Sequence, residues 1–371
     1  MVVRREQLRN IDYILALTVV VICASGILAI KSALHADPHA MDFVRKQAVG
    51  VAVGLIVMFA IATREYQVVI GRVARYLYPI NLVLLGVVLF SHFSHSSHGA
   101  QRWISLGPVQ IQPSEFAKII LICTLALFIT RERDTVRTWP TVFKSLAHIG
   151  VPMLLIAKQP DLGTALVLFA IWFGMMAMAG ANAWHLLAIF VGAVGLFAAL
   201  WHFNVIKTYQ KDRLEVFVNP GADPQDTGYH LRQSEIAIGS GGFTGEGYGH
   251  GTESNGKFIP EQHTDFIFTI VGEEGGFIGC AILLALYLLA LERGVYAMSQ
   301  CDDLFGRLLA AGIVTMLAFH VVVNAGMTMG IMPVVGVPLP CFSYGLSSLL
   351  VNLVAFGLLL SIAARKRRVV F

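Results

Sequence analysis

The chain has 371 residues, of which 56% are hydrophobic and 13% are charged, whereas a soluble domain carries about 25% charged residues. Its apolar residues come in runs of roughly 16 to 25, long enough to cross a hydrocarbon layer of ~30 Å as helices, and not in the ~10-residue alternating segments of an outer-membrane barrel. The net charge of only +4 gives no reason to expect a nucleic-acid partner. We therefore predict an all-α, polytopic integral membrane protein surrounded by membrane lipids.

Ten transmembrane spans are predicted. In chain order they cover residues 11–30, 47–62, 76–93, 114–129, 146–157, 162–180, 184–203, 265–291, 306–330 and 339–364. Pro113 stands immediately before the fourth span, a position that suits the first turn of a helix. The fifth span is short, and Gln159-Pro160-Asp161 follows it at once. Such a proline break resembles the interrupted helices that line polar cavities in membrane proteins.

A single long polar segment separates the seventh and eighth spans. This loop covers residues 204–264, and the whole chain, residues 1–371, is otherwise one transmembrane domain. A glycine run at residues 239–251 contains neither a dinucleotide fingerprint nor a Walker sequence. The run either gives the loop its flexible geometry or offers backbone amides that cradle a phosphate.

Lysine and arginine residues indicate the orientation of the spans. Sixteen of them lie at the two termini and in three short loops on the same side, whereas five lie in the short loops of the opposite side. Loops with such an excess face the cytoplasm. Both termini are therefore predicted to be cytoplasmic and the large loop to face outward, in agreement with an even number of spans.

Asp265 begins the eighth predicted span, directly after the loop. It is either the N-cap of that helix, a position that aspartate favours, or a partly desolvated carboxylate that takes a proton. Glu261 and His263 lie beside it, and Glu273 and Glu274 follow two turns further on. Because a carboxylate inside a membrane is costly and usually faces a cavity or a partner, these neighbours favour a functional role.

Other charges stand at the outward ends of the spans. Glu115 and Lys118 lie three residues apart at the start of the fourth span, where they either neutralise each other or leave Lys118 to contact an anionic group. Arg102 in the preceding loop is likewise a candidate to contact an anionic group. Asp161, between the fifth and sixth spans, either caps the sixth helix or lines a cavity. These residues fit a membrane enzyme with a lipid-linked substrate, a transporter or a scaffold subunit.

Several motifs, in this order along nearly the whole chain, resemble the SEDS family (shape, elongation, division and sporulation). They are residues 99–104 (GAQRWI), 112–118 (QPSEFAK), 159–164 (QPDLGT), 228–230 (GYH), 233–234 (QS), 236–242 (IAIGSGG), 263–268 (HTDFIF), 338–340 (PLP) and 343–345 (SYG). The stretch 249–254 (GHGTES) and the short termini are more similar to the rod-shape branch than to the division branch. Two positions depart from the usual pattern: Leu346 replaces a glycine, and Cys341 replaces a large apolar residue.

The resemblance implies a peptidoglycan glycosyltransferase. Such an enzyme polymerises lipid II into glycan strands at the outer face of the bacterial cytoplasmic membrane, here during cell elongation. A GlcNAc 4-hydroxyl attacks, and undecaprenyl pyrophosphate leaves. Asp265 matches the essential aspartate of the family and is predicted to be the general base, which must lie within about 3 Å of the hydroxyl.

The resemblance also suggests which residues bind the substrate. The growing charge on the pyrophosphate requires cations or a divalent metal such as Mg²⁺ or Mn²⁺, and Arg102, Lys118 and Arg213 are the candidate cations. The other predicted substrate-binding residues are Glu115, Asp161, Gln233, Ser234, Glu261, His263 and Ser343. The expected partner is a class B penicillin-binding protein, the transpeptidase that cross-links the glycan.

Two other functions are compatible with the same features. One is a flippase that moves lipid II across the membrane, which the break between the fifth and sixth spans and the intramembrane charges would suit. The other is a non-catalytic scaffold of the elongation machinery. Incubation of the purified protein with lipid II, with and without its partner, separates the three.

The orientation is directly testable with reporter fusions. A reporter that is active only in the cytoplasm should be active when fused after Phe371 and silent when inserted near Gly256. The reason is the excess of lysine and arginine on the side of the termini. The opposite pattern of reporter activity would overturn the predicted orientation.

Overall fold

The computed structural model describes residues 11–35, 37–90, 94–97, 100–106, 109–203, 208–219, 227–256 and 262–365. Within these residues nine helices are at least 18 residues long and apolar enough to cross a membrane, and α7 is a shorter apolar helix of 17 residues. Because 17 residues still lie within the usual range for a span, each of the ten predicted spans corresponds to one helix. The protein is a multi-pass, all-α membrane protein.

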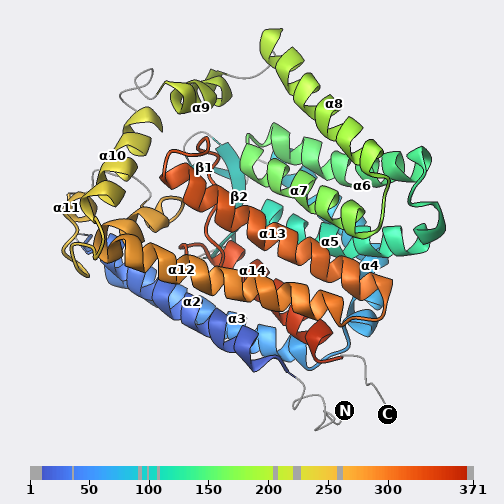
Figure 1. Cartoon of the computed structure of the whole chain (residues 1–371), viewed down its shortest axis with the longest axis horizontal. Coiled ribbons are helices and arrows are strands. Elements are labelled where there is room, and N and C mark those ends of the chain that lie inside the picture. The colour runs from blue at the N-terminus through green and yellow to red at the C-terminus, as the bar shows by residue number, and fades with distance from the viewer. Residues whose placement is uncertain are drawn as a thin grey trace.

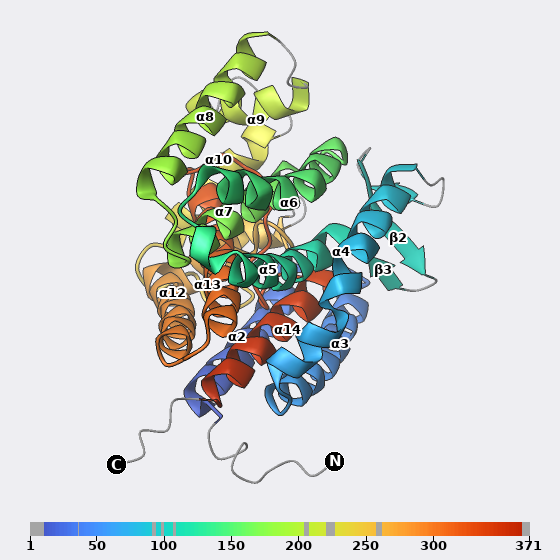
Figure 2. The same cartoon turned by 90° about the vertical axis from the view of Figure 1, so that its right-hand side faces the viewer.

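The ten long helices form one bundle, in which the first helix begins and the last helix ends at the same end, called the termini end below (Figure 1). The helices are α2 (Tyr13–Ala33), α3 (Ala40–Ala62), α4 (Tyr66–Phe90), α5 (Pro113–Arg131), α6 (Trp139–Lys158), α7 (Leu162–Met178), α8 (Ala183–His202), α12 (Ile267–Ser299), α13 (Leu304–Thr328) and α14 (Leu346–Ala363). α5, α13 and α14 are mostly buried, whereas α8 is mostly exposed and stands at the edge of the bundle (Figure 2).

The opposite end of the bundle carries the short elements, and we call it the loop end. The described part of the long loop contains the helices α9 (Thr208–Val218), α10 (Thr227–Ser240) and α11 (Thr252–Asn255). The connection between α4 and α5 adds a small antiparallel sheet in the order β1-β2-β3, from Ser94–Ser97, Ala100–Leu106 and Val109–Ile111, in which Ile104 pairs with Ser94 and Ile111. A 3-10 turn, Arg133–Thr135, follows α5 at the termini end.

The structure corrects several predicted boundaries. α6 has 20 residues with Pro152 inside it, so the fifth span is neither short nor interrupted, and Gln159 to Asp161 form a turn between two complete helices. α3 and α4 begin seven and ten residues before their predicted spans. The additional turns contain Arg45 and Lys46 in α3 and Arg72 and Arg75 in α4, whose long side chains allow a helix to continue past its apolar run. The start of α5 at Pro113 is confirmed.

The last span is also shorter than its apolar run. α14 begins at Leu346, and residues 333–345 form an irregular segment that is largely buried. Leu346, one of the two departures from the family pattern, packs on α3, where a Cβ at Gly50 would lie 2.6 Å from its Cδ2. Cys341, the other departure, is buried with a φ of 60°, a left-handed conformation that costs a non-glycine residue about 1–2 kcal/mol.

The glycine run has a defined structural role, because it repairs a break in α12. Gly276 interrupts the helix with φ 59° and ψ −159°, so the usual bonds from residues 277 and 278 back to Glu273 and Glu274 are not made. Instead, the amides of Glu246 and Gly247 donate to the carbonyls of Glu273 and Glu274 at 2.9 and 3.1 Å. The amides of residues 277 and 278 in turn donate to the carbonyls of residues 242 and 243 at 3.0 and 3.2 Å.

This exchange requires the loop backbone to touch the helix backbone. A Cβ at Gly245 would lie 2.0 Å from the Glu274 carbonyl oxygen, and Gly245 has a φ of 81°. A Cβ at Gly241 would be equally close to the carbonyl of Gly272. Of the two interpretations of the glycine run, the structure therefore favours loop geometry.

Substitution of Gly245 tests this role. Gly245→Ala should lower the midpoint of thermal unfolding in detergent, because alanine pays about 1–2 kcal/mol for the left-handed conformation alone and also meets the helix backbone. Gly239→Ala is the matched control, since Gly239 lies in α10 with nothing within 4 Å of its Cβ position. Equal midpoints for Gly245→Ala and the unsubstituted protein would contradict the packing described here.

Candidate active site

Asp265 lies at the loop end in a turn of residues 262–266, two residues before α12 begins. The N-cap of α12 is Phe266, so the interpretation of Asp265 as a helix cap is wrong. Its side chain is partly exposed, and Oδ2 lies over Gly336, where a Cβ would be 3.1 Å away. The carboxylate therefore stands at a boundary between the protein interior and its surroundings, close to the irregular segment that precedes α14.

Aromatic rings surround the residues next to Asp265. The rings of His263, Phe43 and Tyr344 pack in edge-to-face or tilted pairs, with centroids 5.2–5.5 Å apart. The Tyr344 amide also donates to the His263 carbonyl at 2.9 Å. Burial raises the pKa of the Tyr344 hydroxyl above its usual value, so this hydroxyl stays protonated at neutral pH. The cluster joins α3 and the segment before α14 to the turn that carries Asp265.

The carbonyl of Asp265 is held by α13. Asn324, which is fully buried, donates from Nδ2 to Asp265 O at 2.8 Å and to Val337 O at 2.7 Å. His320, one turn earlier on the same face of the helix, makes a 3.1 Å contact through Nδ1 with Pro338 O. The sequence analysis missed both residues, although two polar residues four apart inside an apolar span are a signal that such side chains face a partner.

Glu115 and Lys118 form the predicted ion pair. They lie in the first turns of α5 with only 4% and 1% of their surfaces exposed, and Lys118 Nζ is 2.8 Å from Glu115 Oε1. Lys118 Nζ also lies 3.3 Å from Nε2 of His320. The pair is thus mutually neutralised and is joined to α13.

Arg102 and Asp161 meet at the turn between α6 and α7. Arg102 extends from β2 and donates from Nε to Gln159 O at 3.0 Å, and its NH2 group donates to Pro160 O. Asp161 caps α7, since Oδ1 accepts from the Thr164 amide at 3.2 Å. Its Oδ2 accepts from the hydroxyls of Ser114 and Thr164 and from the side-chain Nε2 of Gln112. The cap interpretation of Asp161 is confirmed.

The other predicted residues are distributed around this centre. Ser234 in α10 is fully buried, where its hydroxyl lies 2.5 Å from Thr269 Oγ1 and donates to Thr328 O at 2.8 Å, so it joins three helices. The Ser343 hydroxyl accepts from the Leu339 amide at 2.8 Å. Gln233 and Arg213 are partly exposed on α10 and α9. Glu261 lies outside the described residues.

Glu273 has structural partners in the long loop, and Glu274 has one in α2. Glu273 is fully buried and accepts from the amides of Glu253 and Ser254 at the start of α11. Glu274 accepts from the Ser32 hydroxyl at 2.5 Å. These contacts anchor the loop and α2 to the half of α12 that lies at the loop end. The two carboxylates are therefore weaker support for a functional Asp265 than the sequence suggested.

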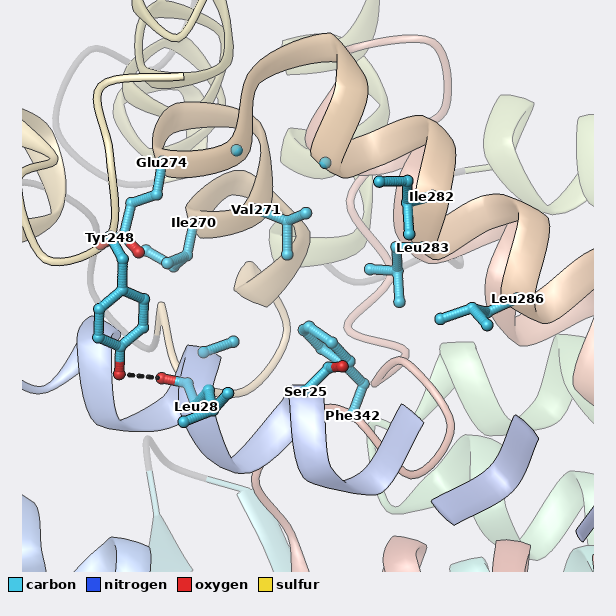
Figure 3. Close-up of a pocket in the computed structure, with 13 residues that line it drawn as sticks. Ser25, Leu28, Tyr248, Ile270, Val271, Glu274, Ile282, Leu283, Leu286 and Phe342 are labelled. Carbon is cyan, nitrogen blue, oxygen red and sulfur yellow. Dashed lines mark hydrogen bonds between the residues drawn. The ribbon is translucent and has the colours of Figure 1, made fainter. Parts of the chain in front are cut away.

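An apolar groove of 270 Å³ lies between α2 and α12 (Figure 3). Phe342 and Leu283 line it, and Tyr248 crosses its rim to donate from its hydroxyl to Leu28 O at 3.0 Å. Glu274 stands at the same rim. A hydrocarbon chain suits this lining, but a pyrophosphate would meet a carboxylate at the rim.

The structure defines a class of protein: a multi-pass membrane protein with a cluster of polar side chains at one end of its helical bundle. The family model of the FtsW/RodA/SpoVE proteins, described as "Cell cycle protein", matches residues 8–368. The chain belongs to this family, which confirms the resemblance found in the sequence.

Named relatives and solved structures agree with the family. Peptidoglycan glycosyltransferase MrdB of Escherichia coli (strain K12) is 39% identical over 96% of this chain and 95% of its own length. Peptidoglycan glycosyltransferase RodA of Treponema pallidum is 35% identical over 96% and 98%. The rod shape determining protein RodA of Thermus thermophilus is similar in structure, with a TM-score of 0.71, 32% identity and coverage of 96% and 97%. A protein in a peptidoglycan synthase complex that coordinates polymerization and crosslinking gives a TM-score of 0.81 at 34% identity, over 95% of this chain and 97% of that one.

The buried pair on α5 makes a specific prediction. Lys118→Met alone should strongly reduce the amount of monodisperse protein in detergent, because loss of one partner leaves a buried charge at a cost of about 3–5 kcal/mol. Lys118→Met combined with Glu115→Gln should recover most of it. Recovery without activity would assign the pair a role beyond mutual neutralisation, whereas no recovery would contradict the neutralised pair.

Proposed function

We propose that this chain, as a peptidoglycan glycosyltransferase, polymerises lipid II and uses Asp265 as the general base. The single observation that carries the assignment is the position of Asp265, a partly exposed carboxylate whose backbone is fixed at the loop end of the bundle. At that place the sugar of a lipid-linked substrate meets a protein side chain while its tail stays in the bilayer.

The reaction joins two lipid II-derived units. The 4-hydroxyl oxygen of the acceptor GlcNAc bonds to the anomeric carbon of the donor sugar, and the bond from that carbon to the pyrophosphate oxygen breaks. Asp265 takes the hydroxyl proton, and undecaprenyl pyrophosphate leaves with the electron pair. A base in this role contributes typically 10²–10⁴-fold to the rate.

Arg102 is the better-supported cation for the leaving pyrophosphate. Its hydrogen bonds to the described residues go to the backbone carbonyls of Gln159 and Pro160, which orient the guanidinium without neutralising its charge. Lys118, by contrast, is already paired with Glu115. Arg213 on α9 is a further candidate. Positive charge placed where the leaving group develops negative charge stabilises the transition state.

A divalent cation stays a prediction. In the described residues no group of three histidine, cysteine or acidic side chains forms a protein metal site. Mg²⁺ is usually held by one or two carboxylates together with substrate phosphates, so Asp265 and the pyrophosphate are the ligands that this chain would bring together. The metal would supply positive charge for the leaving group.

We place the chain in the bacterial cytoplasmic membrane with both termini cytoplasmic, on the strength of the lysine and arginine distribution. A similar chain in a complex that coordinates polymerization and crosslinking supports a class B penicillin-binding protein as the partner. Its single span would pack on exposed apolar helix faces. The flippase alternative loses the interrupted fifth span that had supported it, since α6 is complete.

Substitution of Asp265 tests the proposed base. Asp265→Asn should lower the rate of lipid II polymerisation by roughly 10²–10⁴-fold, because the amide keeps the shape of the carboxylate but takes no proton. The measurement is glycan formation by purified protein with its partner in liposomes. Insertion and the thermal midpoint should be unchanged, since Asp265 caps no helix.

Asp42→Asn serves as the matched control, since Asp42 is a well-exposed carboxylate in the first turn of α3 at the same end of the bundle. It should polymerise lipid II at the unsubstituted rate. A normal rate for Asp265→Asn would show that another group is the base. Movement of lipid II across the liposome membrane without glycan formation would instead favour a flippase.

A further inference from the structure

The turn that carries Asp265 is held from behind by α13. Asn324 has two amide hydrogens and uses its nitrogen for two contacts, with the carbonyls of Asp265 and Val337. The side chain is fully buried, so water cannot replace these bonds without opening the core. One amide group therefore joins the turn before α12 to the irregular segment before α14.

This bridge determines what lies beneath the carboxylate. Gly336 immediately precedes Val337 and has a φ of 68°. It lies under the carboxylate, because a Cβ placed on Gly336 would be 3.1 Å from Asp265 Oδ2. Since the carbonyls of residues 265 and 337 are bound to the same nitrogen, the distance between the turn and the segment is fixed. A side chain at position 336, or a shift of the segment, would move the carboxylate.

His320 holds the next carbonyl of the same segment. Its Nδ1 contacts Pro338 O and its Nε2 contacts the ammonium of Lys118. A carbonyl only accepts and an ammonium only donates. Both contacts are hydrogen bonds if the imidazole is neutral, with its hydrogen on Nδ1 and its lone pair on Nε2. His320 and Asn324, four residues apart on one face of α13, thus bind two consecutive carbonyls.

We propose that Asn324 is the positioning residue of Asp265, and that His320 supports it by fixing the segment that contains Gly336. This inference rests on the proposed role of Asp265 as the base. A general base acts only when it lies within hydrogen-bond reach of the hydroxyl, and a misplacement of about 1 Å can cost 10²-fold in rate. Asn324 itself contacts a backbone carbonyl and not the substrate.

A double-mutant cycle distinguishes positioning from a general structural effect. Asn324→Ala should lower the lipid II polymerisation rate by roughly 10–10²-fold, with little change in the KM for lipid II. In the Asp265→Asn background the same substitution should cause no further loss, because the group that it positions is already absent. A merely structural role would lower the rate by the same factor in both backgrounds and would overturn the proposal.

Two more variants keep the test decisive. Thr328→Val is the matched control, because Thr328 is equally buried one turn further along α13 and its hydroxyl donates, among the described residues, to carbonyls of its own helix. It should keep the unsubstituted rate. If Asn324→Ala does not accumulate in the membrane, Gly336→Ala probes the same bridge from the other side, with the same expectation of a loss that disappears in the Asp265→Asn background.

The outcomes also separate this inference from the proposed function. If Asp265→Asn alone polymerises lipid II normally, the base assignment fails and the positioning role fails with it. If Asp265→Asn is inactive while Asn324→Ala and Gly336→Ala retain the full rate, the base assignment stands and only the positioning role is overturned.

Discussion

The architecture of the loop end depends on the hydrogen bonds of one largely buried irregular segment, residues 333–345. Backbone groups removed from water must be paired within the protein, at a cost of several kcal/mol for each group left unpaired in a membrane. His320 and Asn324 on α13 satisfy the carbonyls of Pro338 and Val337. α7 closes on the same segment, since a Cβ at Gly163 would lie 2.6 Å from the Val335 carbonyl. The segment that they bind therefore explains why His320 and Asn324 lie within an apolar helix. Asn324 also joins the turn with Asp265 to this segment.

On the C-terminal side of Asp265, a second non-helical point, within α12, is stabilised by hydrogen bonds from the long loop. Gly276 interrupts α12, and the glycine loop exchanges backbone hydrogen bonds with both halves of the helix. The half of α12 at the loop end, which begins at Ile267, is therefore held by the loop as well as by the bundle. Asp265 thus lies between two non-helical backbone segments, the break at Gly276 and residues 333–345. In both segments, backbone groups that a helix would pair are hydrogen-bonded to other parts of the chain. Such an arrangement exposes a carboxylate without a flexible backbone, which is what a positioned base requires.

The sequence predicted the features that depend on neighbours along the chain. Apolar run length gave the ten spans, and the spacing of Glu115 and Lys118 gave a pair that the structure confirms at 2.8 Å. Prediction from the sequence was wrong or incomplete where contacts join residues distant in the sequence. It was also wrong where a helix extends beyond its apolar run, as at the start of α3. Asn324 was overlooked because one asparagine scarcely alters the hydropathy of a long span, and nothing local to it reveals the carbonyls of Asp265 and Val337. The glycine run was recognised as unusual, but its insertion into α12 depends on a break some 30 residues further on.

The most direct test of the account is a structure of the Asp265→Asn protein with a lipid-linked glycan acceptor and lipid II bound. We expect the acceptor 4-hydroxyl oxygen within about 3 Å of the residue 265 side chain, over Gly336, and the donor pyrophosphate close to Arg102. A 4-hydroxyl that lies instead against Asp161 or Glu115, beyond hydrogen-bond reach of residue 265, would contradict the central claim that Asp265 is the base.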